Sequence, residues 1–298
     1  MDGFEIDESL VRSLLRDQHP DLGELELREV DGGWDNQLWR LGEELAVRMP
    51  RTERAPDLLR KEHRWLPGLA ARLPLPVPTP LRIGEVSVRF PRPWTIATWV
   101  PGEPADRVPI SDARGADALA GFLRALHTEA PTGAPVSTDR GVPLERLTDG
   151  FEKGLAEVAS QGAAAELRHV RAIWDEALAA PRWEGPRVWL HGDLHPANVV
   201  VSEGTLSGVI DFGDMCVGDP AVDLAAAWVL LPTGAAARFF DAYAQADPAM
   251  IRRAGGLAAL KCLFLILVGR AGDRGLPGGK PAWGPAGRAA LRRVLAPL

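Results

Sequence analysis

Two short stretches of sequence decide which fold to expect. The first is His191-Gly192-Asp193-Leu194-His195-Pro196-Ala197-Asn198, and the second, one predicted hairpin later, is Ile210-Asp211-Phe212-Gly213-Asp214. Four residues separate Asp193 from Asn198, and an Asp-Phe-Gly triplet follows the hairpin. Because a tight turn folds the intervening chain back on itself, Asn198 and Asp211 can reach one bound ion.

These residue types suit phosphoryl transfer. That reaction depends on positioning and charge neutralisation, so one carboxylate must face the acceptor hydroxyl while oxygen ligands hold Mg²⁺ on the nucleotide's phosphates. We expect Asp193 to be the catalytic residue, and Asn198 and Asp211 to be the metal ligands. The alternative, a metal hydrolase that uses His191, Asp193 and His195, is disfavoured because the remaining histidines are scattered along the chain.

The combination resembles the aminoglycoside phosphotransferase family. Protein kinases place an arginine before the catalytic aspartate, whereas this sequence has Gly192, as antibiotic kinases do. The resemblance implies an α+β, two-lobed protein-kinase-like fold, with a small antiparallel N-lobe and a larger, mainly helical C-lobe. It also implies an N-lobe at residues 1–100 that binds nucleotide and a C-lobe at residues 101–298 that holds the catalytic loop, metal site and acceptor site.

Several N-lobe residues are candidates for holding ATP or GTP. The loop at residues 31–36 lies where a kinase covers the phosphates, although its glycine pattern is incomplete. On the next strand, Arg48 stands where a kinase has a lysine that binds phosphate. Glu62 on the following helix is the best candidate to pair with Arg48, and Glu53 is the runner-up. A connector then offers backbone groups to the purine base. The expected nucleotide-binding residues are Gly32, Gly33, Trp34, Asp35, Asn36, Arg48, Glu62, Thr98, Trp99 and Val100.

The segment Gly218-Asp219-Pro220-Ala221-Val222-Asp223-Leu224 resembles a further part of the same family. We expect Asp219 to cap a helix and Asp223 to bind backbone groups of the catalytic loop, because short acidic side chains accept well from exposed N–H groups. Both roles are structural. His191 and His195 are also interpreted as local hydrogen-bonding residues.

Alternating apolar patterns predict strands at residues 25–30, 37–41, 44–49, 82–90 and 94–99. Helical patterns cover residues 7–16, 58–73, 111–129 and 147–180, and Pro67 is expected to bend or end the second of these helices early. The longest uninterrupted apolar runs, at residues 224–231 and 262–268, are too short to span a bilayer. We therefore expect no membrane partner.

The bulk composition points to a folded cytoplasmic protein. Hydrophobic residues make up 46% of the chain and charged residues 25%, the net charge is -6, and only two cysteines are present. The negative charge argues against nucleic acid as a partner. The partners expected are a nucleoside triphosphate with Mg²⁺ and a small hydroxylated acceptor, and the sequence gives no oligomeric state.

The acceptor stays open at this stage. Aminoglycosides are polycations that favour acidic sites, yet from Met250 onward the chain has nine basic residues and one acid, Asp273. Aminoglycosides, macrolides, other natural products and metabolites such as homoserine or choline are all candidates. A nucleotide-binding regulator without turnover is the alternative from another class, and only Arg48 favours it.

Overall fold

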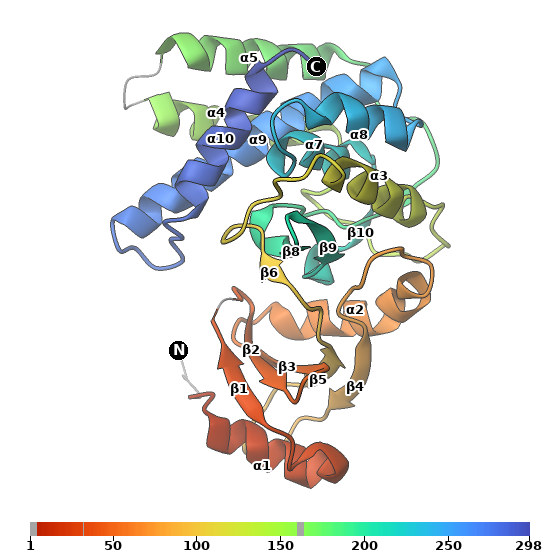
Figure 1. Cartoon of the computed structure of the whole chain (residues 1–298), viewed down its shortest axis with the longest axis vertical. Helices are drawn as coiled ribbons and strands as arrows, with labels where there is room; N and C mark the ends of the chain where they lie inside the picture. The colour runs from red at the N-terminus through yellow and green to blue at the C-terminus, as the bar shows by residue number, and fades with distance from the viewer. Residues whose placement is uncertain (1–4, 32, 160–163) are drawn as a thin grey trace. The chain divides into compact units, whose positions relative to one another are not determined.

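The computed structural model describes residues 5–31, 33–159 and 164–298, which form two compact units. Unit 1 comprises Met1–Arg72, Pro76–Pro101 and Ile210–Gly213, and unit 2 comprises Leu73–Leu75, Gly102–Val209 and Asp214–Leu298 (Figure 1). The short Asp-Phe-Gly segment therefore belongs to unit 1, although the chain on either side of it belongs to unit 2.

Unit 1 is a five-stranded antiparallel sheet with one helix on each face (Figure 1). The strand order is β1-β2-β3-β5-β4. Its elements are α1 (Glu8–Gln18), a 3-10 turn (Pro20–Leu22), β1 (Leu27–Val30), β2 (Asn36–Leu41), β3 (Leu45–Pro50), α2 (Ala55–Ala70), β4 (Pro80–Gly84) and β5 (Trp94–Thr98).

Strand β3 places apolar side chains on one face of the sheet and a charged side chain on the other. Successive side chains of a strand point to opposite faces. Val47 and Met49 are fully buried in the core that α1 closes with Leu14. Arg48, between them in sequence, instead pairs with Glu62 of α2. The alternation of β3 thus places an arginine under α2 while its neighbours build the core.

Unit 2 is mainly helical and contains two small antiparallel sheets, β6-β8-β9 and β10-β7. Its strands are β6 (Glu103–Pro104), β7 (Val188–Leu190), β8 (Val199–Ser202), β9 (Thr205–Val209) and β10 (Cys216–Gly218). Its helices are α3 (Gly115–Leu126), α4 (Thr148–Ala159), α5 (Ala164–Ala179), α6 (Ala221–Leu224), α7 (Ala226–Val229), α8 (Ala235–Tyr243), α9 (Pro248–Asp273) and α10 (Trp283–Leu295), with 3-10 turns at Leu144–Leu147 and Pro196–Asn198. A further 3-10 turn, Phe212–Asp214, begins in unit 1 and ends in unit 2.

Helix α9 is the long central helix of unit 2 and packs against α4, α5, α6, α7 and α10. By length and composition alone it could cross a membrane, and it is the one helix of the described residues that passes this test. Its most apolar window is 56% buried inside the unit, which is typical of a core helix rather than a lipid-facing one. The expectation of no membrane partner stays a prediction.

Most expected elements are present, with three differences. The strand expected at residues 82–90 ends at Gly84, because Ser87 and Phe90 close a turn through mutual hydrogen bonds. Helix α2 runs through Pro67 and ends at Ala70, so the proline stops it only one turn later. The helix expected at residues 147–180 is two helices, α4 and α5.

Candidate active site

The catalytic loop in unit 2 holds Asp193 and Asn198 together. The amide nitrogen of Asn198 donates to the main-chain oxygen of Asp193 at 3.0 Å and lies 3.4 Å from its carboxylate Oδ2. His195 caps the 3-10 turn between them, since its Nδ1 accepts from the main-chain N–H of Ala197 at 3.3 Å. The spacing of four residues therefore brings the two predicted side chains into contact.

Asp223, at the start of α6, fixes the beginning of this loop. Its carboxylate accepts from the main-chain N–H groups of His191 at 2.7 Å and Gly192 at 2.8 Å, and His127 Nε2 lies 3.3 Å from it. Gly192 has a φ of +83°, a conformation that favours glycine. The predicted scaffold role of Asp223 is confirmed, and the positive φ explains why arginine is absent before Asp193.

The carboxylate of Asp193 faces a lysine that the sequence interpretation missed. Lys261 of α9 places its Nζ 2.5 Å from Asp193 Oδ1, Arg140 Nη2 is 3.7 Å from the same oxygen, and His195 Nε2 is 3.4 Å from Oδ2. Burial alone would raise the pKa of Asp193, but Lys261, His195 and Arg140 outweigh it and hold this pKa well below its usual range. Asp193 is therefore ionised at neutral pH.

One signal in the sequence points to Lys261. It is the only charged residue between Arg253 and Arg270, inside a long apolar helix. A lone charge in such a segment costs free energy unless it is paired, so it marks a contact with an acidic partner. The identity of that partner depends on the packing of α9 and not on local sequence.

In unit 1, the structure brings together Arg48, Glu62 and Asp211. Arg48 Nη1 donates to Glu62 Oε2, and its Nη2 lies 3.8 Å from Asp211 Oδ1. Burial alone would lower the pKa of Arg48, but the charges of Glu62 and Asp211 raise it above its usual value. Glu62 is fully buried and its second oxygen, Oε1, has no hydrogen-bond partner among the described residues. The predicted partner of Arg48 is confirmed, and no ion pair between Arg48 and the runner-up Glu53 is recorded among the described residues.

The loop before β2 is anchored through Asp35. Its carboxylate accepts from Arg54 Nη2 at 2.6 Å and Thr52 Oγ1 at 2.6 Å, while Gly33 has a φ of +70°. Trp34 is 54% exposed and Asn36 is buried with its Oδ1 unpartnered among the described residues. Gly32 lies outside the described residues. A role for this loop in nucleotide binding stays a prediction.

The connector after β5 has fewer free backbone groups than predicted. The Trp99 N–H donates to the carbonyl of Glu44 at 2.7 Å, and the Thr98 N–H donates to Thr79 at 3.0 Å. Within the described part of the chain, no backbone acceptor is recorded for the N–H of Val100. The N–H of Val100 is therefore the better candidate to donate to a purine base. The N–H of Trp99 is excluded as such a donor, because it already donates to the carbonyl of Glu44.

The oxygen donors expected for Mg²⁺ fit that ion chemically. The amide nitrogen of Asn198 is used by Asp193, which leaves the carbonyl oxygen of Asn198 for a cation. Asp211 has a φ of +61°, unusual for a residue other than glycine, and its carboxylate is 54% exposed. Mg²⁺ takes one or two carboxylates together with phosphates and waters. The residues described contain no cluster of three or more His, Cys, Asp or Glu that could hold a metal. Binding of Mg²⁺ by Asn198 and Asp211 stays a prediction.

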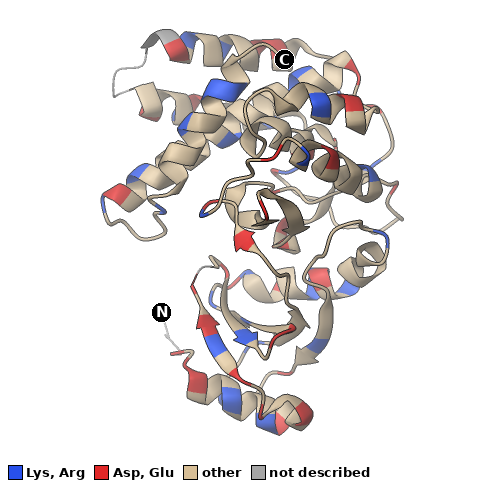
Figure 2. Cartoon of the chain, viewed as in Figure 1, with Lys and Arg blue, Asp and Glu red and all other residues tan. Residues whose placement is uncertain are grey.

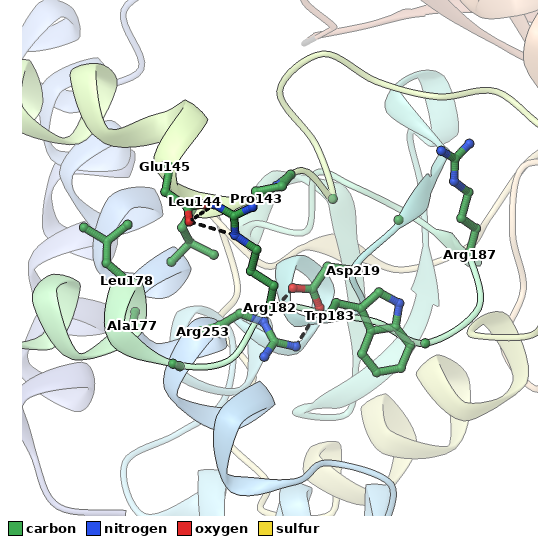
Figure 3. A pocket seen from close by; sticks show the side chains of 14 residues that line it. Pro143, Leu144, Glu145, Ala177, Leu178, Arg182, Trp183, Arg187, Asp219 and Arg253 are labelled. Atoms are coloured by element: carbon green, nitrogen blue, oxygen red, sulfur yellow. Dashed lines mark hydrogen bonds and ion pairs between the residues drawn. The ribbon is translucent and has the colours of Figure 1, made fainter.

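A hollow of about 290 Å³ in unit 2 is lined by residues outside the catalytic loop (Figure 3). Glu145 and Arg182 form an ion pair at its edge, and Arg253 pairs with Asp219 at its floor. Asp219 also accepts from the N–H of Ala221, the first residue of α6, although Pro220 and not Asp219 occupies the N-cap position. Neither Asp193 nor Asn198 lines this hollow, and its paired charges serve the scaffold.

Several basic residues of α9 and α10, which the sequence analysis related to the choice of acceptor, bind other parts of the scaffold instead. Figure 2 shows lysines and arginines spread along both helices. Arg253 is buried against Asp219, Arg270 donates to the carbonyl of Glu157, and Arg293 donates to the carbonyls of Trp228 and Val229. Of this basic group, only Lys261 is recorded at Asp193 among the described residues.

Comparison with known proteins identifies the family. A model described as the phosphotransferase enzyme family matches residues 26–257. The chain is 31% identical over 139 residues to an aminoglycoside 3'-phosphotransferase of Escherichia coli, which covers 45% of this chain and 51% of the relative. It is 33% identical over 212 residues to a homoserine kinase of Methylocella silvestris, covering 65% and 62% respectively. The matches thus span less than two thirds of these relatives.

Solved structures share the fold over nearly the whole chain. The GDP complex of a mutant aminoglycoside 2'-phosphotransferase-IIIa has a TM-score of 0.70 at 21% identity and covers 97% of both chains. A macrolide 2'-phosphotransferase from Brachybacterium faecium has a TM-score of 0.62 at 24% identity, covering 93% of this chain and 97% of the other. The predicted fold class is confirmed.

Proposed function

The chain belongs to the phosphotransferase enzyme family, and from this premise we propose that it transfers the γ-phosphoryl group of a nucleoside triphosphate to a hydroxyl of a small molecule. One observation carries the proposal. In the catalytic loop, an ionised Asp193 is held by Asn198, on a backbone that Asp223 fixes. This is the arrangement that phosphoryl transfer to an alcohol needs.

Each residue has a distinct part in the reaction. Asp193 orients the acceptor hydroxyl and accepts its proton as the phosphorus–oxygen bond forms, and the nucleoside diphosphate leaves. Arg48, fixed by Glu62, contacts the phosphates of the donor. Asn198 and Asp211 are the proposed ligands of Mg²⁺, which supplies charge neutralisation at the phosphates when bound. The Gly33 loop covers the phosphates, and the connector around Val100 contacts the base of ATP or GTP.

The acceptor is a small hydroxylated compound. Relatives and structural neighbours carry the names of aminoglycoside, macrolide and homoserine phosphotransferases. Aminoglycosides, macrolides and hydroxylated metabolites are therefore the candidate acceptors. An antibiotic-resistance role follows only if the acceptor is an antibiotic.

The Arg48–Glu62 pair supports an enzyme over a regulator without turnover. The replacement of lysine by arginine is the only feature that favours the regulator. Arg48 keeps the buried carboxylate partner that the phosphate-binding residue of a kinase requires. Asp193 also has no purpose in a protein that only binds nucleotide.

A phosphorylation screen tests the proposal. Purified protein is incubated with Mg²⁺ and either ATP or GTP, together with kanamycin, a macrolide, homoserine and simple sugars, and new phosphate esters are detected by mass spectrometry. We expect at least one acceptor to be phosphorylated, and Asp193→Asn to abolish the product. Metal-dependent nucleotide binding without transfer to any member of a broad alcohol panel would instead favour the regulator.

We also propose a cytoplasmic location. Cys216 and Cys262 are both buried and are not joined in a disulfide, and burial raises the pKa of Cys262 to about 12. Such thiols are unreactive and form no disulfide, which suits a reducing compartment.

A further inference from the structure

Helix α9 exposes one large aromatic side chain close to the catalytic loop. Phe264 is 44% exposed, while its neighbours Leu263 and Leu265 are buried in the core. It lies three residues after Lys261, so both side chains share one face of the helix. Phe264 therefore lies about one helical turn from Lys261, the residue that pairs with Asp193.

Lys261 connects this ring to the catalytic base. Its ammonium lies 2.5 Å from Asp193 Oδ1 and 5.6 Å from the centre of the Phe264 ring. A single side chain therefore contacts both the carboxylate and the exposed aromatic face. A molecule that presents a hydroxyl to Asp193 has the Phe264 ring within reach of its remaining atoms.

A second aromatic ring from α10 supports the first. Trp283 lies 6.3 Å from Phe264 and 4.6 Å from the ring of His195, both measured between ring centres. Its indole N–H donates to Asp106 Oδ2 at 3.0 Å, which fixes the orientation of the ring. We call the row of rings formed by Phe264, Trp283 and His195 the aromatic wall. Trp283 and His195 are buried, so Phe264 is the ring of this wall that a bound molecule can contact.

The nearby acidic side chains are already engaged. Asp193 pairs with Lys261, Asp214 lies 3.6 Å from Arg140, and Asp106 accepts from Trp283. A polycation bound here would meet the ammonium of Lys261 and two carboxylates, Asp193 and Asp214, that already have cationic partners. Asp106 keeps its negative charge, because its partner is the neutral indole of Trp283. Like charges at such distances disfavour binding, whereas an aromatic wall favours an apolar face.

We propose that this aromatic wall is the acceptor subsite, and that it selects alcohols with an apolar face beside the reacting hydroxyl over polycationic alcohols. The proposal rests on the proposed kinase activity, because it concerns the same site. Phe264 binds the apolar face of the acceptor, Trp283 supports Phe264, and Lys261 excludes ammonium groups next to the hydroxyl. Phe264 and Lys261 are specificity residues in this scheme.

The test uses two matched sugars that differ only in an aromatic group. Phenyl β-D-glucoside and methyl β-D-glucoside are compared with kanamycin as acceptors, and binding of each to the protein with Mg²⁺ and ADP is measured by saturation-transfer NMR. We expect the phenyl glucoside to bind about tenfold more tightly than the methyl glucoside, as one stacked ring allows. Phe264→Ala should erase this difference, and Phe264→Tyr should restore it.

Two control variants separate a specific effect from a general one. Leu276→Ala removes another exposed apolar side chain of unit 2, and Lys153→Met removes an exposed lysine of α4. Both should keep the wild-type preference. Lys261→Met should increase the ratio of kanamycin to phenyl glucoside in kcat/KM by about tenfold, because it removes a like charge beside the acceptor.

Several outcomes would overturn the proposal and leave the kinase activity intact. Equal affinity for the two glucosides, or a Phe264→Ala variant that behaves like Leu276→Ala, means that Phe264 is an ordinary surface residue. If kanamycin is turned over efficiently and Lys261→Met does not alter this turnover, Lys261 does not determine the choice of acceptor. Failure of the proposed function itself is distinguishable, because neither the glucosides nor kanamycin nor any other alcohol of the panel is then phosphorylated.

Discussion

Arg48 is the residue at which this chain departs most from the kinase pattern, and its surroundings predict two separate effects of mutation. Arg48→Ala removes a charge-assisted phosphate contact and should lower kcat/KM about ten- to hundredfold, or about 1.5–3 kcal/mol. It also leaves Glu62 buried without its partner, which should destabilise the fold by about 3–5 kcal/mol. Steady-state kinetics and chemical unfolding measure the two effects.

Two further variants separate these effects. Arg48→Met combined with Glu62→Gln removes both charges and should recover much of the stability but none of the nucleotide affinity. Arg48→Lys should recover part of the activity, because it restores the charge without the guanidinium fork. Arg60→Ala, in an exposed pair with Asp57 on the same helix, is the matched control. Wild-type kinetics in a folded Arg48→Ala protein would show that the phosphates are held without Arg48.

Asp193 and Asp211 should differ in which step they affect. Asp193→Asn removes the proton acceptor and should lower kcat about 10²- to 10⁴-fold, with nucleotide affinity nearly unchanged. Asp211→Asn should weaken metal-nucleotide binding, because it replaces a charged oxygen ligand with a neutral amide. Calorimetry with Mg²⁺ and nucleotide measures binding, and a coupled assay measures turnover. The assignment fails if the two variants show the same loss of affinity.

At the scale of elements, Asp223 connects α6 with the catalytic loop. Asp223→Ala leaves the N–H groups of His191 and Gly192 without their acceptor in a fully buried place. We expect a loss of about 2–4 kcal/mol in stability and a lower kcat, because the loop loses its fixed position. Thermal unfolding and kinetics of the same preparation measure both.

The control for Asp223 is Asp117→Ala on α3. Asp117 is paired with Arg238 on α8, but both side chains are about half exposed, so water replaces the lost contact. The melting temperature and kcat of the Asp117→Ala variant should stay close to those of the wild type. If Asp223→Ala behaves in the same way, the catalytic loop keeps its shape without that carboxylate.

At the scale of the whole molecule, ligand binding should stabilise the protein only when metal is present. A ligand that binds the folded state at about 100 times its Kd adds about 2.7 kcal/mol of stability. We therefore expect ATP or GTP to raise the melting temperature with Mg²⁺ but not with EDTA. Asp211→Asn should reduce this shift. An equal shift with Mg²⁺ and with EDTA would contradict the assignment of Asn198 and Asp211 as metal ligands.

Local sequence was sufficient for the parts of the site that neighbouring residues build. The spacing of Asp193 and Asn198 and the turn that precedes Asp211 are short-range features, and they predicted the catalytic loop. The resemblance to the kinase pattern singled out Arg48 and its partner Glu62. The chemistry of short acidic side chains likewise predicted the role of Asp223. These signals act over a few residues, where backbone geometry leaves few alternatives.

Only the tertiary structure decided which distant groups meet. Lys261 lies 68 residues from Asp193 in sequence, and nothing local states that α9 turns this lysine toward the catalytic loop. The same holds for the wall of Phe264 and Trp283, and for the arginines of α9 and α10 that bind backbone carbonyls instead of an acceptor. Charge composition counts these bases but cannot place them, because the packing of whole helices determines which side of each helix faces the site.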